Sequence, residues 1–175
     1  MKMLKKLLAV VLTGAMALTL FTACGSNAVR DKDIADALNN IVKLNDSEVT
    51  FTPRAKEREM AQKVAALLES HSEDDSNSAE LSAKIQGILG IDQGGVNENN
   101  FVWVQNALTD KLGAEGQAFQ VMESLTDKGG AYNFLSLGSK EPADTRYMGT
   151  ALCKIPDQKD NLVTVRVIVV TAEAK

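Results

Sequence analysis

The sequence predicts an α+β fold in which helices pack on both faces of a small antiparallel sheet, as an α-β-α sandwich. Two observations predict this arrangement. Segments with apolar residues at helical spacing occupy the earlier part of the 175-residue chain, and strand-like segments close it. Helices followed by strands are typical of α+β domains. The last strand is largely apolar on both faces, and such a strand is normally covered on both sides.

Four segments carry apolar residues every three or four positions, which is the spacing of an amphipathic helix. They span residues 32–44, 53–70, 79–89 and 115–126. We expect Thr52 to be the N-cap of the second helix, with Pro53 in its first turn. A further stretch from Phe101 to Leu112 suggests another helix, although Phe-Val-Trp-Val alone could form a strand.

The clearest strand-like segments gather at the end of the chain. Residues 147–155 and 162–171 read as two strands around a polar turn, and a short extended piece is expected at 49–51. One face of the last strand carries Val163, Val165, Val167 and Val169. The other face carries Leu162, Thr164, Arg166, Ile168 and Val170. We therefore expect this strand at the centre of the sheet, between two helical layers.

The start of the chain has the pattern of a secretory signal. Three lysines fall within the first six residues, an apolar run follows from Leu7 to Leu20, and small residues precede Cys24. The run is short for a membrane-spanning helix, which needs about 20 residues. Phe-Thr-Ala-Cys at 21–24 resembles the lipobox of bacterial lipoproteins, with Phe21 in place of the commoner leucine. The alternative is an ordinary signal peptide cut near Ala23.

The lipobox resemblance implies that lipid is attached to Cys24 and that the chain is cut before it. It divides the sequence into a signal peptide at 1–23, a lipidated tether at 24–31 and a single domain at 32–175. The expected location is the extracytoplasmic face of the cell membrane. The signal carries three of the 19 basic residues and none of the 23 acidic ones, so the mature net charge is near −7. This charge argues against a nucleic-acid partner and against an electrostatic contact with the membrane.

The sequence holds no complete set of catalytic or metal-binding residues. His71 is the only histidine, so a histidine-rich metal site is excluded, and we predict neither a metal nor a cofactor. No nucleophile elbow, phosphate-binding loop or dinucleotide fingerprint is present. If Cys24 carries lipid, Cys153 has no partner. Its place in a strand predicts a buried, inert thiol.

Four segments, taken in order, resemble the CAP superfamily of cysteine-rich secretory, antigen 5 and pathogenesis-related 1 proteins. They are the helix from Arg54 to His71, Asn97-Glu98-Asn99, residues 129–135 and residues 147–151. The resemblance implies an α-β-α sandwich with a cleft. Its candidate cleft residues are His71, Glu98, Asn99, Tyr132 and Asn133. Gly130 stands where the family places a second histidine, so a two-histidine metal site cannot form.

Together these features predict a membrane-anchored, non-catalytic binding or interaction module at the cell surface. Its ligand is left open among protein, glycan and lipid. The alternative function is a hydrolase-like enzyme in which His71 and Glu98 act as an acid–base pair. An unrelated α+β lipoprotein is the alternative to the family resemblance.

Overall fold

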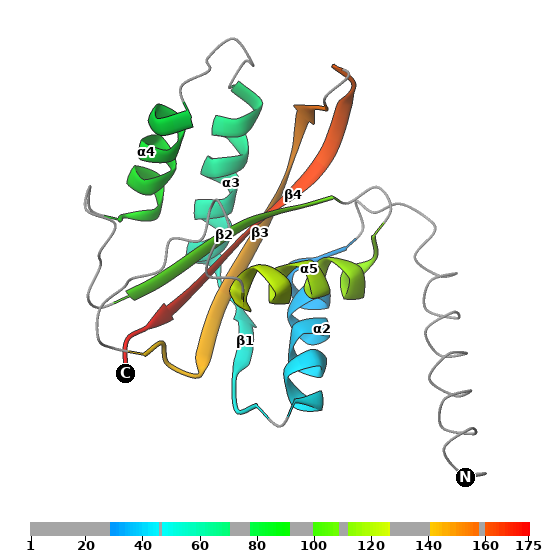
Figure 1. Ribbon diagram of the computed structural model, residues 1–175, viewed down its shortest axis with the longest axis vertical. Coiled ribbons are helices and arrows are strands. Elements are labelled where there is room, and N and C mark those ends of the chain that lie inside the picture. The colour runs from blue at the N-terminus through cyan, green and yellow to red at the C-terminus, as the bar shows by residue number, and fades with distance from the viewer. Residues whose placement is uncertain are drawn as a thin grey trace, which may run out of the picture.

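The computed structural model describes residues 29–45, 47–70, 78–91, 100–108, 112–126, 141–157 and 160–175. The signal segment lies outside these ranges. In chain order the elements are α2 (Asp31–Leu44), β1 (Thr50–Pro53), α3 (Ala55–Ser70), α4 (Ser78–Leu89), β2 (Asn100–Leu108), α5 (Ala114–Thr126), β3 (Thr145–Pro156) and β4 (Leu162–Glu173). They form an α+β fold, as predicted (Figure 1). No helix in the described ranges is long and apolar enough to cross a membrane.

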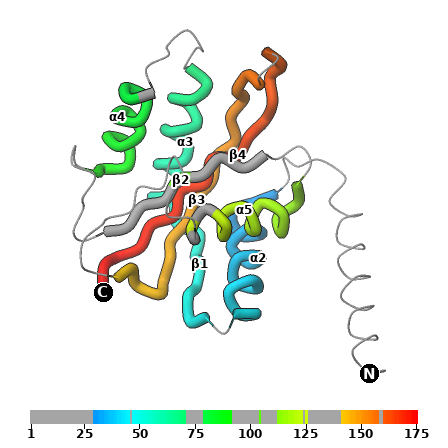
Figure 2. Tube along the Cα trace, in the orientation of Figure 1, coloured from blue at the N-terminus to red at the C-terminus, as the bar shows by residue number. Residues whose placement is uncertain are grey.

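The four strands form one mixed sheet in the order β1-β3-β4-β2. β4 lies between β3 and β2 and is antiparallel to both, so the predicted central strand is confirmed (Figure 2). The prediction of a wholly antiparallel sheet is wrong, because β1 runs parallel to β3. A long stretch of chain that includes α3, α4 and α5 separates β1 from β3. Only a tight hairpin connection would require neighbouring strands to run in opposite directions.

Two local expectations are wrong. The stretch from Phe101 is the strand β2, not a helix, and all nine of its residues pair with β4. The long run of sheet pairing outweighs the apolar spacing that suggested a helix. Thr52 is not an N-cap, because Thr52 and Pro53 pair with Tyr147 and Met148 in the sheet. Proline is tolerated there because β1 is an edge strand.

Side chains of β4 alternate between two apolar clusters, one on each face of the sheet. Ile168, Val170 and Ala172 pack with buried residues of α2 and α5. Val165, Val167 and Val169 pack with buried residues of α3 and α4. In Figure 1, α3 and α4 lie together on one side of the strands, and α2 and α5 lie together on the other. Both faces of the central strand are therefore covered, which accounts for its two apolar faces.

The first turn of α3 lies directly against β3 at Gly149. A Cβ atom built on Gly149 would lie 2.0 Å from the backbone nitrogen of Arg58 and 2.3 Å from the carbonyl carbon of Glu57. No side chain fits at that separation. Glycine at this position is what allows the helix to approach the strand so closely. The contact fixes Glu57 and Arg58 over the sheet.

Candidate functional site

Every site residue predicted from the sequence lies outside the described residues. These residues are the lipidation site Cys24 and the cleft candidates His71, Glu98, Asn99, Tyr132 and Asn133. The structure therefore neither brings them together nor separates them. The polar sites presented below are built from other residues.

A pocket of about 370 Å³ opens where β3 begins and β4 ends. It lies against the first turns of α3 and the C-terminal end of α4. The lining residues are Arg54, Lys56, Met60, Gly87, Ile88, Leu89, Gly90, Tyr147, Thr171, Ala172 and Glu173. Its volume falls at the lower end of the range for small-molecule sites, about 300–1,000 Å³.

Arg54 is the central charged group of this pocket. Its guanidinium group donates two hydrogen bonds to the carboxylate of Glu57, one of them 2.6 Å from Nε to Oε2. The guanidinium carbon also lies 3.7 Å from the centroid of the Tyr147 ring, which is cation–π distance. The Thr171 hydroxyl donates to Glu57 at 2.7 Å. These contacts hold the guanidinium group flat against the pocket wall.

Glu57 is fully buried, yet its carboxylate stays charged. Burial alone would raise the pKa of Glu57, but the hydrogen bonds from Arg54 and Thr171 outweigh burial and hold that pKa below its ordinary value. Because Glu57 is ionised, it neutralises Arg54. Lys56 and Glu173 add one further charge of each sign to the pocket wall. The pocket therefore has no net charge of its own.

A second polar cluster lies on the other face of the sheet, at the start of α2. Asp31 accepts a 2.6 Å hydrogen bond from the Thr150 hydroxyl group. It also forms an ion pair with Arg58, whose Nε group lies 2.7 Å from the Asp31 carboxylate. Arg166 donates to Thr150 at 2.8 Å and to the carbonyl oxygen of Val29 at 2.7 Å. Arg58 belongs to α3 and Asp31 to α2. Their ion pair therefore links the two helical layers.

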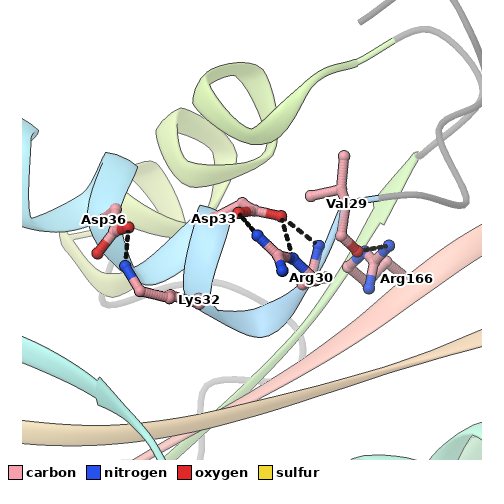
Figure 3. A network of polar contacts seen from close by, with 6 residues as sticks. All are labelled: Val29, Arg30, Lys32, Asp33, Asp36 and Arg166. Carbon is pink, nitrogen blue, oxygen red and sulfur yellow. Dashed lines mark hydrogen bonds and ion pairs between the residues drawn. The ribbon is translucent and has the colours of Figure 1, made fainter.

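Figure 3 shows how Arg166 reaches the chain just before α2. Arg166 comes from β4 and points to the Val29 carbonyl group, while Arg30 and Asp33 pair beside it. Burial lowers the pKa of Arg166, and the nearby carboxylates of Asp31 and Asp33 oppose that effect. The Nε group of Arg166 has no hydrogen-bond partner. This cluster attaches the start of α2 to the sheet.

Cys153 is buried, as predicted, on the face of the sheet covered by α3 and α4. Burial raises the pKa of its thiol to about 11, and the charge of Glu69 adds to the increase. The thiolate, which is the reactive form of cysteine, is therefore rare at neutral pH.

The pocket supplies recognition groups without a matched nucleophile and base among the described residues. No three His, Cys, Asp or Glu side chains of the described ranges are close enough together to hold a metal ion. Sequence reasoning missed the pocket. The sequence feature that could have indicated the pocket is the pair Arg54 and Glu57. These residues are three positions apart at a helix start and so face the same side.

Comparisons with known proteins identify no relative. No protein-family model, no curated protein and no solved structure matches this chain.

Proposed function

We propose that this chain is a lipid-anchored extracytoplasmic lipoprotein whose folded domain binds a ligand without catalysing a reaction. The observation that carries the binding role is the pocket at Arg54. Its lining is mainly polar, with fixed charged and hydroxyl groups beside a smaller apolar wall, so it offers a ligand several hydrogen-bonding partners. The lipobox-like tetrad ending at Cys24 supports the anchor.

The walls of the pocket favour a small, largely polar ligand that has one apolar part. Met60, Ile88 and Leu89 supply the apolar contacts. Arg54 is held rigid by Glu57 and Tyr147, so little side-chain entropy is lost when it donates to a ligand. Lys56 and Glu173 at the wall suit a ligand that carries charges of both signs, such as a short peptide end or a peptide-bearing glycan.

The resemblance to the CAP superfamily is a proposal of the same kind. It draws support from the helices on both faces of the sheet and from the position of residues 147–151 in β3. Under this proposal the domain descends from a cleft-bearing ancestor and retains binding, while Gly130 replaces a metal-binding histidine.

The binding proposal is tested by filling the pocket. Gly87 lines it, and a Cβ atom at Gly87 would meet nothing within 4 Å, so Gly87→Leu starts a bulky side chain from open space at the pocket wall. Ala83→Leu, on an exposed part of the same helix, is the matched control. Short peptides, cell-wall glycopeptides and fatty acids would be screened by NMR shifts. We expect the screen to find ligands that bind both the wild type and Ala83→Leu. The same ligands should fail to bind Gly87→Leu.

Two results would contradict the binding proposal. Ligands that bind Gly87→Leu as well as wild type would place the binding surface elsewhere. Hydrolysis of a cell-wall or peptide substrate, abolished by His71→Ala, would establish the enzyme alternative.

The anchor is tested separately by mass spectrometry of the mature N-terminus. We expect a chain that begins at Cys24 and carries acyl chains on that residue. An unmodified Cys24, or cleavage at another position, would contradict the lipoprotein assignment.

A further inference from the structure

The tether that precedes the domain is fixed to the sheet at Val29. The carbonyl oxygen of Val29 accepts a 2.7 Å hydrogen bond from Arg166, which is only 4% exposed. Arg166 is on β4, the central strand, so this attachment point is part of the rigid core. The position of Val29 relative to the sheet is therefore set by the fold.

Little chain separates this attachment point from the proposed lipid. Val29 is five residues after Cys24. Five fully extended residues reach at most about 18 Å. If acyl chains on Cys24 lie in a bilayer, Val29 and the sheet surface around Arg166 must stay close to that bilayer.

An exposed, partly apolar surface lies beside the attachment point. Leu152 pairs with Arg166 across the strands and is 37% exposed, and Leu162, further along β4, is 70% exposed. Leu162 pairs in turn with Pro156. Alternation along the strands places all three on the same face as Arg166, together with the exposed Lys154 and its partner Thr164. We call Leu152, Pro156 and Leu162 the hairpin face.

Among the described residues, the apolar packing of the helices does not extend to this part of the sheet. The apolar cluster formed with α2 and α5 includes Ile168, Val170 and Ala172 of β4 but no residue of the hairpin face. Leu162 is four residues from Arg166, which is about 13 Å along a strand. The exposed leucine therefore lies within the reach of the tether.

We propose that the hairpin face rests on the same bilayer that holds the lipid of Cys24, so that the domain has one fixed orientation on the membrane. This proposal rests on the lipid anchor proposed above. The contact is apolar and shallow, because the charges of Asp157, Lys159 and Asp160 at the turn and of Lys154 on the hairpin sum to zero and supply no net electrostatic attraction. A bilayer of neutral lipid is the expected partner surface.

The proposed orientation has a consequence for the ligand pocket. Thr171 in the pocket wall is nine residues along β4 from Leu162, a separation of about 30 Å. Thr171 also belongs to the opposite face of the sheet, where it bonds Glu57 of α3. A docked hairpin therefore presents the pocket away from the membrane, toward ligands in the surrounding compartment.

The test places spin labels on the full lipidated protein in vesicles of neutral phosphatidylcholine. One label replaces Leu162, and a control label replaces Leu44, which is 85% exposed at the far end of α2. Leu44 is about 20 Å along the helix from Asp31, and Figure 1 shows α2 running away from the hairpin. The parent protein, with Cys153 buried, is the labelling blank.

Two collision rates are measured for each spin label. One is with oxygen, which concentrates in lipid, and the other is with a nickel complex that stays in water. We expect an oxygen-to-nickel ratio several-fold higher for Leu162→Cys than for Leu44→Cys. Equal, water-like ratios on vesicle-bound, lipidated protein would overturn the docking proposal and leave the anchor intact. Absence of lipid on Cys24, seen by mass spectrometry and by failure to float with vesicles, would overturn both.

Discussion

Glu57 and Arg166 are buried charged residues on opposite faces of the sheet, and their charges are held in different ways. On the face covered by α3, the carboxylate of Glu57 receives a two-point contact from Arg54 and a hydroxyl bond from Thr171. On the face covered by α2, Arg166 bonds only neutral oxygens, those of Thr150 and Val29, and its Nε group is unpaired. Glu57 is therefore paired with the opposite charge of Arg54, whereas Arg166 has no direct carboxylate partner among the described residues.

This difference indicates separate roles for the two arginines. Arg54 belongs to the wall of a pocket, whereas Arg166 attaches the start of α2 to the sheet. Arg54 is aligned by Glu57 and stays 38% exposed at the pocket wall, where a ligand can reach it. Arg166 is buried, and its contacts are used to hold the start of α2 and the tether. A paired, partly exposed guanidinium group suits recognition, whereas a buried one bound to a backbone carbonyl suits attachment. Variants on each face should therefore respond differently.

Gly149→Ala should have the largest effect, because it attacks the contact between α3 and β3 directly. The new methyl group would lie 2.0 Å from the Arg58 backbone nitrogen, so α3 must shift away from the sheet. We expect the free energy of unfolding to fall by about 3 kcal/mol or more. Urea denaturation measures the change, and Gly87→Ala is the control because its added methyl group meets open space. A loss no larger than that of the control would mean that α3 is not fixed by this contact.

Glu57→Gln should have the next largest effect, and one that depends on pH. We expect a loss of about 2 kcal/mol at pH 7, below the usual range for a broken buried pair because Arg54 can reach water. The pKa of Glu57 is lower in the folded protein than its ordinary value of 4.5. The carboxylate therefore stabilises the fold fully above that ordinary value, and the stabilisation is lost as pH falls through the folded-state pKa.

Urea denaturation at several pH values provides the measurement for Glu57→Gln. The gap between wild type and variant should narrow below pH 4.5. Asp36→Asn is the control, because Asp36 forms an exposed pair with Lys32. A gap that stays constant down to the acid limit would show that Glu57 is not a charged partner of Arg54.

Arg166→Met should change stability much less, which sharpens the contrast between the two faces. Replacing a buried charge by an apolar side chain of similar size is often neutral or stabilising. Here the replacement also removes the unpaired Nε group. We expect a change of about 1 kcal/mol or less in urea denaturation, together with faster amide exchange at the start of α2. A large loss of stability would instead make Arg166 as important to folding as Glu57.

The sequence predicted most elements of the fold because their local patterns agree with their tertiary setting. The apolar faces of β4 indicated two covering layers, and both are present. Phe101–Leu108 was ambiguous because a strand that pairs with β4 over its whole length depends on residues far along the chain. The pocket was missed for the same reason, since Arg54 and Tyr147 meet only once β3 lies beside α3. The predicted cleft lies outside the described residues, so that prediction stands as it was made.

The smallest effect is expected for the alkylation of Cys153 in the folded protein. Cys153 and Leu152 are neighbours in β3 and lie on opposite faces of the sheet, so they compare the two faces directly. Cys153 is 2% exposed under α3 and α4, whereas Leu152 is 37% exposed on the hairpin face. Burial raises the pKa of the Cys153 thiol to about 11, so little thiolate exists at pH 7. In a soluble chain beginning at Gly25, we expect alkylation of Cys153 to be slow until the protein unfolds. The matched control is Leu152→Cys combined with Cys153→Ala, whose thiol should react promptly under the same conditions. Rapid alkylation of Cys153 in the folded protein would show that the α3–α4 layer opens readily and would make this thiol a candidate nucleophile.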